Sequence, residues 1–233
     1  MPDHDQPTND FAGRSVLIAG ATGGLGSALA AALAGRGATL TLVARRSDPL
    51  AALPVDGHRA ALDLRDPGNC DAAVEAAVGH AGRLDVVVNA VGVVVFGPVT
   101  DLSVDAMEEL FLTNTFVPIG LAKAALPHLE AGGAIVNISG VIAEQNLPGM
   151  AAYGASKAAV RSFDEALARE ARRSKVRVID ARPPHTETGL ATRPVEGTAP
   201  KMPEGLSPDH VASVIVNALA GKATDLPSDA FAV

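Results

Sequence analysis

The side chains best suited to chemistry are Tyr153 and Lys157, which lie four residues apart in the segment Tyr-Gly-Ala-Ser-Lys. Tyr153 is the only tyrosine among the 233 residues. Residues at this spacing share one face of a helix. A free phenol has a pKa of ~10, and a nearby ammonium stabilises the phenolate, so we expect Lys157 to lower the pKa of Tyr153. The phenol could then give a proton to a carbonyl oxygen or take one back from an alcohol.

A glycine-rich turn lies far upstream of this pair. The segment Gly20-Ala-Thr-Gly-Gly-Leu-Gly26 follows an apolar run at 15–19 and precedes an alanine-rich stretch at 26–36. Glycine allows backbone to approach a phosphate closely, and a helix N-terminus attracts a pyrophosphate through its free N–H groups and dipole. In this context the turn indicates a nucleotide-binding loop, whereas the alternative is an ordinary strand-to-helix turn.

The residues after the second apolar run bear on which dinucleotide would bind. NAD-binding proteins usually place an acid there to hold the ribose 2′-hydroxyl. Here the run at 39–44 is followed by Arg45 and Arg46. Guanidinium groups pair well with phosphate, so the pattern predicts NADP(H) in preference to NAD(H). The alternative is that both arginines are solvated surface charges.

Apolar runs alternate with helical stretches along the whole chain. Strands are expected at 15–19, 39–44, 59–64, 84–89, 134–139 and 176–181. Helices are expected at 26–36, 67–81, 103–129 (bent at Pro118 and Pro127), 151–173 and 208–220. Strands that are apolar throughout and separated by helices describe a parallel sheet covered on both faces. We therefore predict one α/β domain over 1–233, a doubly wound Rossmann fold of about seven strands, with a tail at 1–12 and a substrate loop at 183–208.

Composition excludes several classes of function. Lys and Arg total 19 against 26 for Asp and Glu, a net charge of −7, which argues against nucleic acid or an anionic membrane as partner. With a single cysteine, Cys70, no internal disulfide or cysteine-built zinc site can form, and the six histidines show no metal-ligand spacing, so no metal is expected. We expect no membrane span and no secretory signal, which makes the cytoplasm the default location.

These motifs occur in one order that resembles the short-chain dehydrogenase/reductase family, from about Ser15 to Leu219. Asp63-Leu64 is similar to its adenine-contacting pair, Asn89-Ala-Val-Gly92 to its N-N-A-G segment, and Pro183-Pro-His-Thr-Glu-Thr188 to its P-G-x-V-x-T stretch. The resemblance implies catalytic roles for Asn114, Ser139, Tyr153 and Lys157. It implies cofactor contacts at Gly20, Thr22, Gly23, Gly24, Leu25, Gly26, Arg45, Arg46, Asp63, Leu64, Asn89, Ala90, Val91, Gly92, Tyr153, Lys157, Pro183, Thr186 and Thr188. Family members commonly form homodimers or homotetramers, and we expect the same here.

The chain departs from the family pattern at Gly140. The family places a substrate-polarising serine thirteen residues before the tyrosine, and that position here is glycine. Ser139 is its neighbour, but a one-residue offset on a strand turns a side chain to the other face. Three readings stay open: Gly140 kinks the strand so that Ser139 enters the site; another group, such as Gln145, Asn146, His185 or a water, takes the role; or the protein binds NADP(H) with little turnover.

The leading prediction is an NADP(H)-dependent oxidoreductase that interconverts a ketone or aldehyde and an alcohol. The alternative is an NADP(H)-binding protein whose turnover is weak because of Gly140. The segments expected to wall the substrate pocket, 93–99, 141–150 and 183–208, are rich in apolar residues. They favour a small, moderately hydrophobic substrate.

Overall fold

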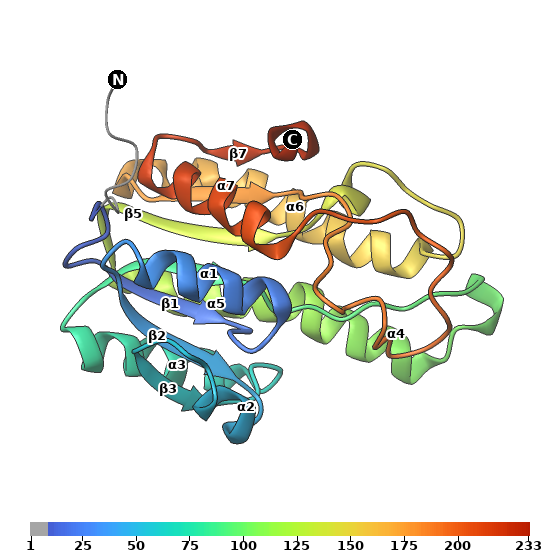
Figure 1. The fold of residues 1–233 in the computed structure, drawn as a ribbon, viewed down its shortest axis with the longest axis horizontal. Helices are drawn as coiled ribbons and strands as arrows, with labels where there is room; N and C mark the ends of the chain where they lie inside the picture. Colours follow the sequence, from blue (N-terminus) through green and yellow to red (C-terminus); the bar gives the residue numbers. More distant parts are fainter. Residues whose placement is uncertain (1–8) are drawn as a thin grey trace.

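The computed structural model describes residues 9–233, which form one seven-stranded sheet in the order β3-β2-β1-β4-β5-β6-β7 (Figure 1). Every neighbouring pair of strands is parallel. The strands are β1 (Ser15–Ala19), β2 (Thr39–Ala44), β3 (His58–Ala61), β4 (Leu84–Asn89), β5 (Leu129–Ile138), β6 (Arg177–Ala181) and β7 (Asp225–Leu226). The predicted doubly wound α/β fold is confirmed.

Helices cover both faces of this sheet because its strands are apolar on both faces. One face packs on α1 (Gly24–Ala34) and α7 (Pro208–Ala220). The other packs on α3 (Pro67–Ala81), α5 (Val117–Ala125) and α6 (Ala151–Glu170). Along β1, Val16 and Ile18 join the first core, whereas Leu17 and Ala19 join the second. The site residues lie where these strands end.

The helical region expected at 103–129 is divided. It consists of α4 (Val104–Phe111), a π-helical turn (Leu112–Phe116), α5 and a short 3₁₀ turn. Ser103 caps its start as expected, its Oγ accepting the Ala106 N–H at 3.1 Å. Pro118 has no N–H for the carbonyl of Asn114, which accounts for the wide turn just before it. By length and composition 104–128 could cross a membrane, but 56% of its most apolar window is buried, as in the core helix of a globular fold.

Several boundaries differ from those expected. The third strand occupies 58–61 rather than 59–64, a short helix α2 (Ser47–Ala51) was not expected, and β7 has only two residues. The tail predicted at 1–12 is shorter, because Phe11 is fully buried and its N–H donates to the Arg36 carbonyl at 3.1 Å. Residues 1–8 of that prediction lie outside the described part of the chain.

The predicted substrate loop contains no helix or strand between β6 and α7, but two isolated bridges fasten it. Thr186 pairs with Leu206 at its base, and Glu196 pairs with Val95 nearer its tip. In Figure 1 this orange segment runs beside α4. The loop is therefore held against the carboxyl end of the sheet.

Candidate active site

The glycine loop is shaped by close contacts with the protein's own backbone. Gly20 has φ +79°, and a Cβ there would lie 2.8 Å from the carbonyl carbon of Ala90. A Cβ at Gly24 would lie 2.7 Å from the Cα of Thr188, and one at Gly26 would lie 2.1 Å from the Gly20 oxygen. These glycines thus let three segments meet: the turn after β1, the segment after β4, and the start of the long loop.

The N-terminus of α1 fits an anionic group. Gly23 at the cap position has no side chain to occupy the free N–H groups, and the first turn carries no acid. Thr22 beside it is exposed, while Leu25 is partly buried. Free N–H groups and the positive end of the helix dipole suit the pyrophosphate of a dinucleotide.

Charged residues gather at the end of the sheet where the adenosine half is expected. Arg45 and Arg46 are exposed, and Arg45 Nη1 lies 3.8 Å from Glu109 of α4. Arg65 donates to Asp63 at 2.9 Å from Nε and also pairs with Glu109. This contact with Arg65 holds the pKa of Asp63 below its ordinary value. Glu109 was not singled out from the sequence, since it is remote along the chain from the other four residues.

Two residues predicted to act together, Lys157 and Asn114, converge over Gly92. Lys157 is 6% exposed, and its Nζ donates to the Ile138 carbonyl at 2.7 Å. A Cβ built on Gly92 would lie 3.6 Å from both Lys157 Nζ and Asn114 Oδ1. Asn114 is fully buried, and it accepts the Val93 N–H and donates to the Val93 carbonyl, each at 2.9 Å. Asn114 thereby ties the π-helical turn to the segment that follows β4.

Two positioning residues were missed by sequence reasoning. Ser156 Oγ donates to the Tyr153 carbonyl at 2.8 Å and accepts Asn114 Nδ2 at 3.1 Å. Thr115 Oγ1 donates to the Ser156 carbonyl at 2.9 Å. The π-helical turn is therefore hydrogen-bonded to α6 at Ser156, between Tyr153 and Lys157. The available signal was the position of Ser156 inside Tyr-Gly-Ala-Ser-Lys.

The acidity of Tyr153 differs from the expectation. Burial raises its pKa to about 12, because the ring packs in an apolar cluster with Val95 and Leu110. Burial also lowers the pKa of Lys157 to about 8, opposed in part by the charge of Asp180. The Lys157 Nζ donates to the Ile138 carbonyl, and burial is what sets the pKa of Tyr153 in the fold.

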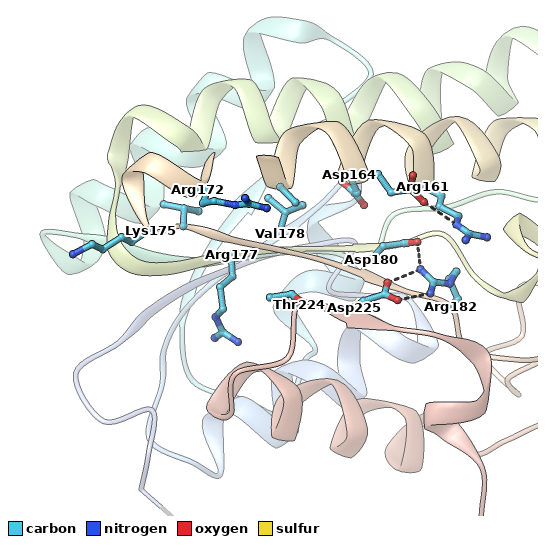
Figure 2. A pocket seen from close by; sticks show the side chains of 13 residues that line it. Arg161, Asp164, Arg172, Lys175, Arg177, Val178, Asp180, Arg182, Thr224 and Asp225 are labelled. Carbon is cyan, nitrogen blue, oxygen red and sulfur yellow. Dashed lines mark hydrogen bonds and ion pairs between the residues drawn. The ribbon is translucent and has the colours of Figure 1, made fainter. Parts of the chain in front are cut away.

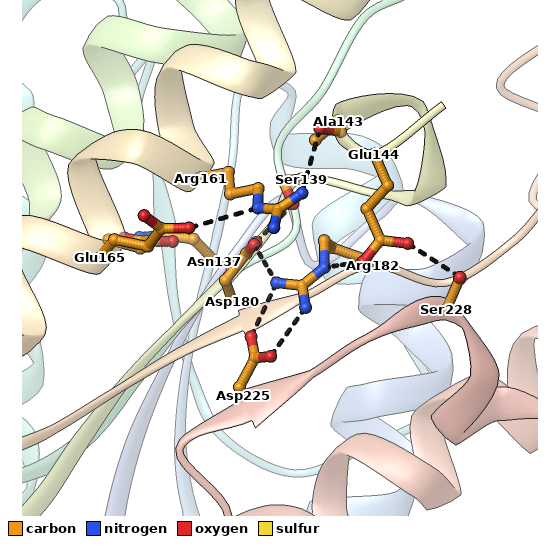
Figure 3. Close-up of polar contacts among 11 residues, drawn as sticks. Asn137, Ser139, Ala143, Glu144, Arg161, Glu165, Asp180, Arg182, Asp225 and Ser228 are labelled. Carbon is orange, nitrogen blue, oxygen red and sulfur yellow. Dashed lines mark hydrogen bonds and ion pairs between the residues drawn. The ribbon is translucent and has the colours of Figure 1, made fainter. Parts of the chain in front are cut away.

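The hydroxyl of Ser139 is engaged on the neighbouring strand β6. Ser139 is fully buried, and its Oγ donates to Asp180 on β6. Figure 3 shows both residues among the surrounding polar side chains. Gly140 does adopt a backbone that favours glycine, with φ +81°. A Cβ there would have only the Pro183 oxygen nearby, at 3.8 Å. The kink is therefore present, but it leaves open space at position 140 and does not turn Ser139 into that space.

The other groups considered for the missing hydroxyl have different surroundings. Asn146 is exposed, and its Oδ1 lies 3.1 Å from the Cβ position of Gly154, the residue after Tyr153. Gln145 is also exposed. His185 Nε2 lies 3.2 Å from Glu187 in the long loop. The Asn146 side chain therefore lies against the first turn of α6.

The long loop supplies the remaining predicted cofactor contacts. Pro183 is buried, Thr186 Oγ1 donates to the Pro184 carbonyl at 2.9 Å, and Thr188 Oγ1 accepts the Leu190 N–H at 3.3 Å. Further along, Glu196 accepts the N–H of Ser103 at 2.9 Å and also its hydroxyl. The loop thus reaches from the glycine turn to the N-terminus of α4.

A parallel sheet with a glycine turn at its first strand and a Tyr–Lys helix at its carboxyl edge defines a Rossmann-type, dinucleotide-dependent oxidoreductase. The profile of the short chain dehydrogenase family matches residues 14–198, and the chain belongs to the short-chain dehydrogenase/reductase family. It is an oxidoreductase that acts on CH–OH or carbonyl groups.

Relatives cover most of the chain. "Dehydrogenase/reductase SDR family protein 7-like" of Anopheles gambiae is 32% identical over 92% of this chain and 74% of its own length. "Ketoacyl reductase HetN" of Nostoc sp. is 30% identical over 92% and 78%. A short chain dehydrogenase from Burkholderia cenocepacia, solved in complex with NADP, superposes with a TM-score of 0.83 at 26% identity, over 94% of this chain and 97% of that one.

Proposed function

We propose that this protein is an NADP(H)-dependent oxidoreductase that interconverts a ketone or aldehyde and an alcohol. The observation that carries the proposal is the convergence of Lys157 Nζ and Asn114 Oδ1 over Gly92. Each atom lies 3.6 Å from the point where a Cβ would lie if Gly92 carried a side chain. This point lies beside the glycine turn and one helical turn from Tyr153. Groups that can bind a ribose, orient water and move a proton therefore meet where the nicotinamide half of the cofactor would extend.

The residues of this protein would take separate roles in the reaction. The bound cofactor supplies or accepts hydride. Lys157 would hold the ribose hydroxyls of the nicotinamide, and Tyr153 would give a proton to the substrate oxygen or remove it. Asn114 Nδ2 donates to Ser156 Oγ, and this bond holds the π-helical turn against α6 beside Tyr153. Apolar contacts of Tyr153 with Val95 and neighbouring residues favour a hydrophobic substrate.

The preference for NADP(H) rests on Arg45 and Arg46. Both guanidinium groups are exposed directly after β2, and Arg45 keeps 56% of its side chain exposed despite its distant pairing with Glu109. A 2′-phosphate would be a stronger partner for Arg45 than a carboxylate at 3.8 Å. The NADP complex of the Burkholderia relative supports the same assignment.

The test is consumption of NADPH with a panel of ketones and aldehydes, run beside Tyr153→Phe. The phenylalanine variant keeps the apolar ring contacts and removes only the hydroxyl. We expect turnover by the wild type and a loss of at least ~100-fold in kcat for the variant, with NADPH binding retained. Equal rates for the two proteins would refute the role of Tyr153.

A second candidate is an NADP(H)-binding protein with little turnover. It is favoured by one specific observation: position 140 has no hydroxyl, and the hydroxyl of Ser139 is buried on Asp180. Loss of one donor to a developing oxyanion typically costs ~10²–10³ in rate. Tight NADPH binding without turnover above that of Tyr153→Phe would establish this candidate instead.

A further inference from the structure

A polar row crosses the otherwise apolar interface between α6 and the sheet. Asn89, Asn137 and Asp180 are register partners on β4, β5 and β6. Two residues earlier on the same strands, Val87, Ile135 and Val178 form part of the apolar core. This polar row therefore lies near the carboxyl ends of the strands, next to the candidate active site, and α6 packs over it.

The hydrogen bonds in this layer run in one direction. The Val91 N–H donates to Asn89 Oδ1 at 3.2 Å, Asn89 Nδ2 donates to Asn137 Oδ1 at 3.3 Å, and Asn137 Nδ2 donates to Asp164 Oδ1 at 2.7 Å. An asparagine side chain can present either its oxygen or its nitrogen to a neighbour. The groups at the two ends of the hydrogen-bonded series therefore fix the orientation of both asparagines. Val91 can only donate at one end, and Asp164 supplies the acceptor at the other.

Asp164 is costly to bury. It is 3% exposed on α6, and within residues 9–233 its Oδ2 has no hydrogen-bond partner. Desolvation raises its pKa to about 8, and the neighbouring charge of Asp180 acts in the same direction. Its other side borders a hollow of about 470 Å³ between α6 and β6–β7 (Figure 2). A buried carboxyl with an unpaired oxygen calls for a function that an apolar residue could not perform.

The Val91 end of this series of hydrogen bonds lies in the proposed cofactor site. A Cβ at Gly20 would be 2.9 Å from the Val91 nitrogen, and Gly92 is the residue over which Lys157 and Asn114 meet. A small rotation of Asn89 would therefore shift the backbone that packs on the glycine turn. Within residues 9–233, the hydrogen bonds connect Asp164 to this segment through Asn137 and Asn89.

We propose that Asp164 is a positioning residue for cofactor binding: it fixes the orientation of Asn137 and Asn89 and thereby holds the 90–92 backbone in place for the dinucleotide. The reading of 90–92 as a cofactor-lining segment rests on the proposed function. The orienting effect of Asp164 on Val91 does not, and it is measurable without any cofactor.

The experiment compares Asp164→Leu, which removes the acceptor, with Asp164→Asn, which keeps an acceptor oxygen in the same place. Glu165→Leu, at an exposed position on the same helix, is the matched control. Amide hydrogen exchange at Val91 is measured by NMR, and NADPH affinity by fluorescence titration. We expect Asp164→Leu to speed Val91 exchange about 10-fold and weaken NADPH about 5- to 10-fold, while Asp164→Asn and Glu165→Leu stay within about twofold of wild type.

The kinetic parameters separate positioning from a general structural effect. Asp164→Leu should raise the KM for NADPH while changing kcat little, because no reacting group is altered. Unchanged Val91 exchange in a folded Asp164→Leu, or the same loss in the asparagine variant, would overturn the proposal. If the leucine variant does not fold, Asp164→Ala makes the same comparison. If the wild type binds neither NADPH nor NADH, the proposed function fails, and Val91 exchange still decides the role of Asp164.

Discussion

The buried carboxyl of Asp164 should make the stability of the protein depend on pH in a defined way. Its pKa is raised from 3.8 to about 8 in the fold, chiefly by burial. Between these values the folded chain keeps a proton that the unfolded chain has released. Stability from this group is therefore fully present below pH ~4, falls as pH rises and stops falling above pH ~8.

The size of the effect follows from the two pKa values. Each pH unit inside the window costs about 1.4 kcal/mol for a single group, so the loss between pH 5 and pH 7 is about 2–3 kcal/mol. For a domain of this size, 1 kcal/mol shifts Tm by about 2–4 °C. Asp164→Asn cannot ionise, keeps an acceptor for Asn137 and resembles Asp in shape, so it should escape this loss.

The assay is thermal unfolding of both proteins by circular dichroism at pH 5, 6, 7 and 8. The difference in Tm, variant minus wild type, should grow by about 5–10 °C between pH 5 and pH 7 and level off near pH 8. Using the difference removes the pH effects that are common to both proteins. A constant difference across this range would show that Asp164 does not hold its proton in the folded state and would refute the reasoning.

Other expected outcomes concern the site and its loop. Arg45→Ala should weaken NADPH by about 10-fold or more while leaving NADH nearly unchanged, measured as kcat/KM with each coenzyme; equal losses would remove the coenzyme assignment. Gly140→Ser should preserve or raise carbonyl reduction, yet lower Tm because of its positive φ; Gly140→Ala is the control, with the same loss in Tm and no gain in kcat. Glu196→Ala removes both acceptors for Ser103 and should speed limited proteolysis within 183–208 severalfold, an effect absent if that contact does not hold the loop.

Sequence reasoning succeeded where a local pattern dictates the structure. Apolar runs bounded by glycine or proline placed the β1, β2 and β4 strands at their observed positions, and Pro67 marked the start of α3. Tyr153 and Lys157 were found because their spacing on a helix is itself the signal. Lys157 and Asn114 do converge, as the resemblance implied.

The remainder depends on contacts between distant segments, which periodicity does not report. Strand β7 has two residues in a polar tail and exists because Asp225 and Leu226 pair with β6. The π-helical turn depends on where Pro118 falls relative to Asn114. The pKa of Tyr153 was expected to fall, because helical spacing suggested an ammonium beside the phenol; in the fold Lys157 reaches Ile138 instead, and burial dominates.

The structural use of Ser139 bears on where the substrate oxygen finds its donor. Asp180 is buried and needs donors, and it takes the hydroxyl of Ser139 and Arg182 Nη1, the latter at 2.6 Å. Arg182 also binds Asp225 and Glu144 (Figure 3), so one guanidinium joins β6, β7 and the turn after β5. Turning Ser139 toward Tyr153 would leave a buried carboxylate short of a partner, at a cost of about 1–3 kcal/mol. The same network fixes the start of 141–150, so that segment is well placed to present a replacement donor beside Tyr153, whereas Ser139 is not.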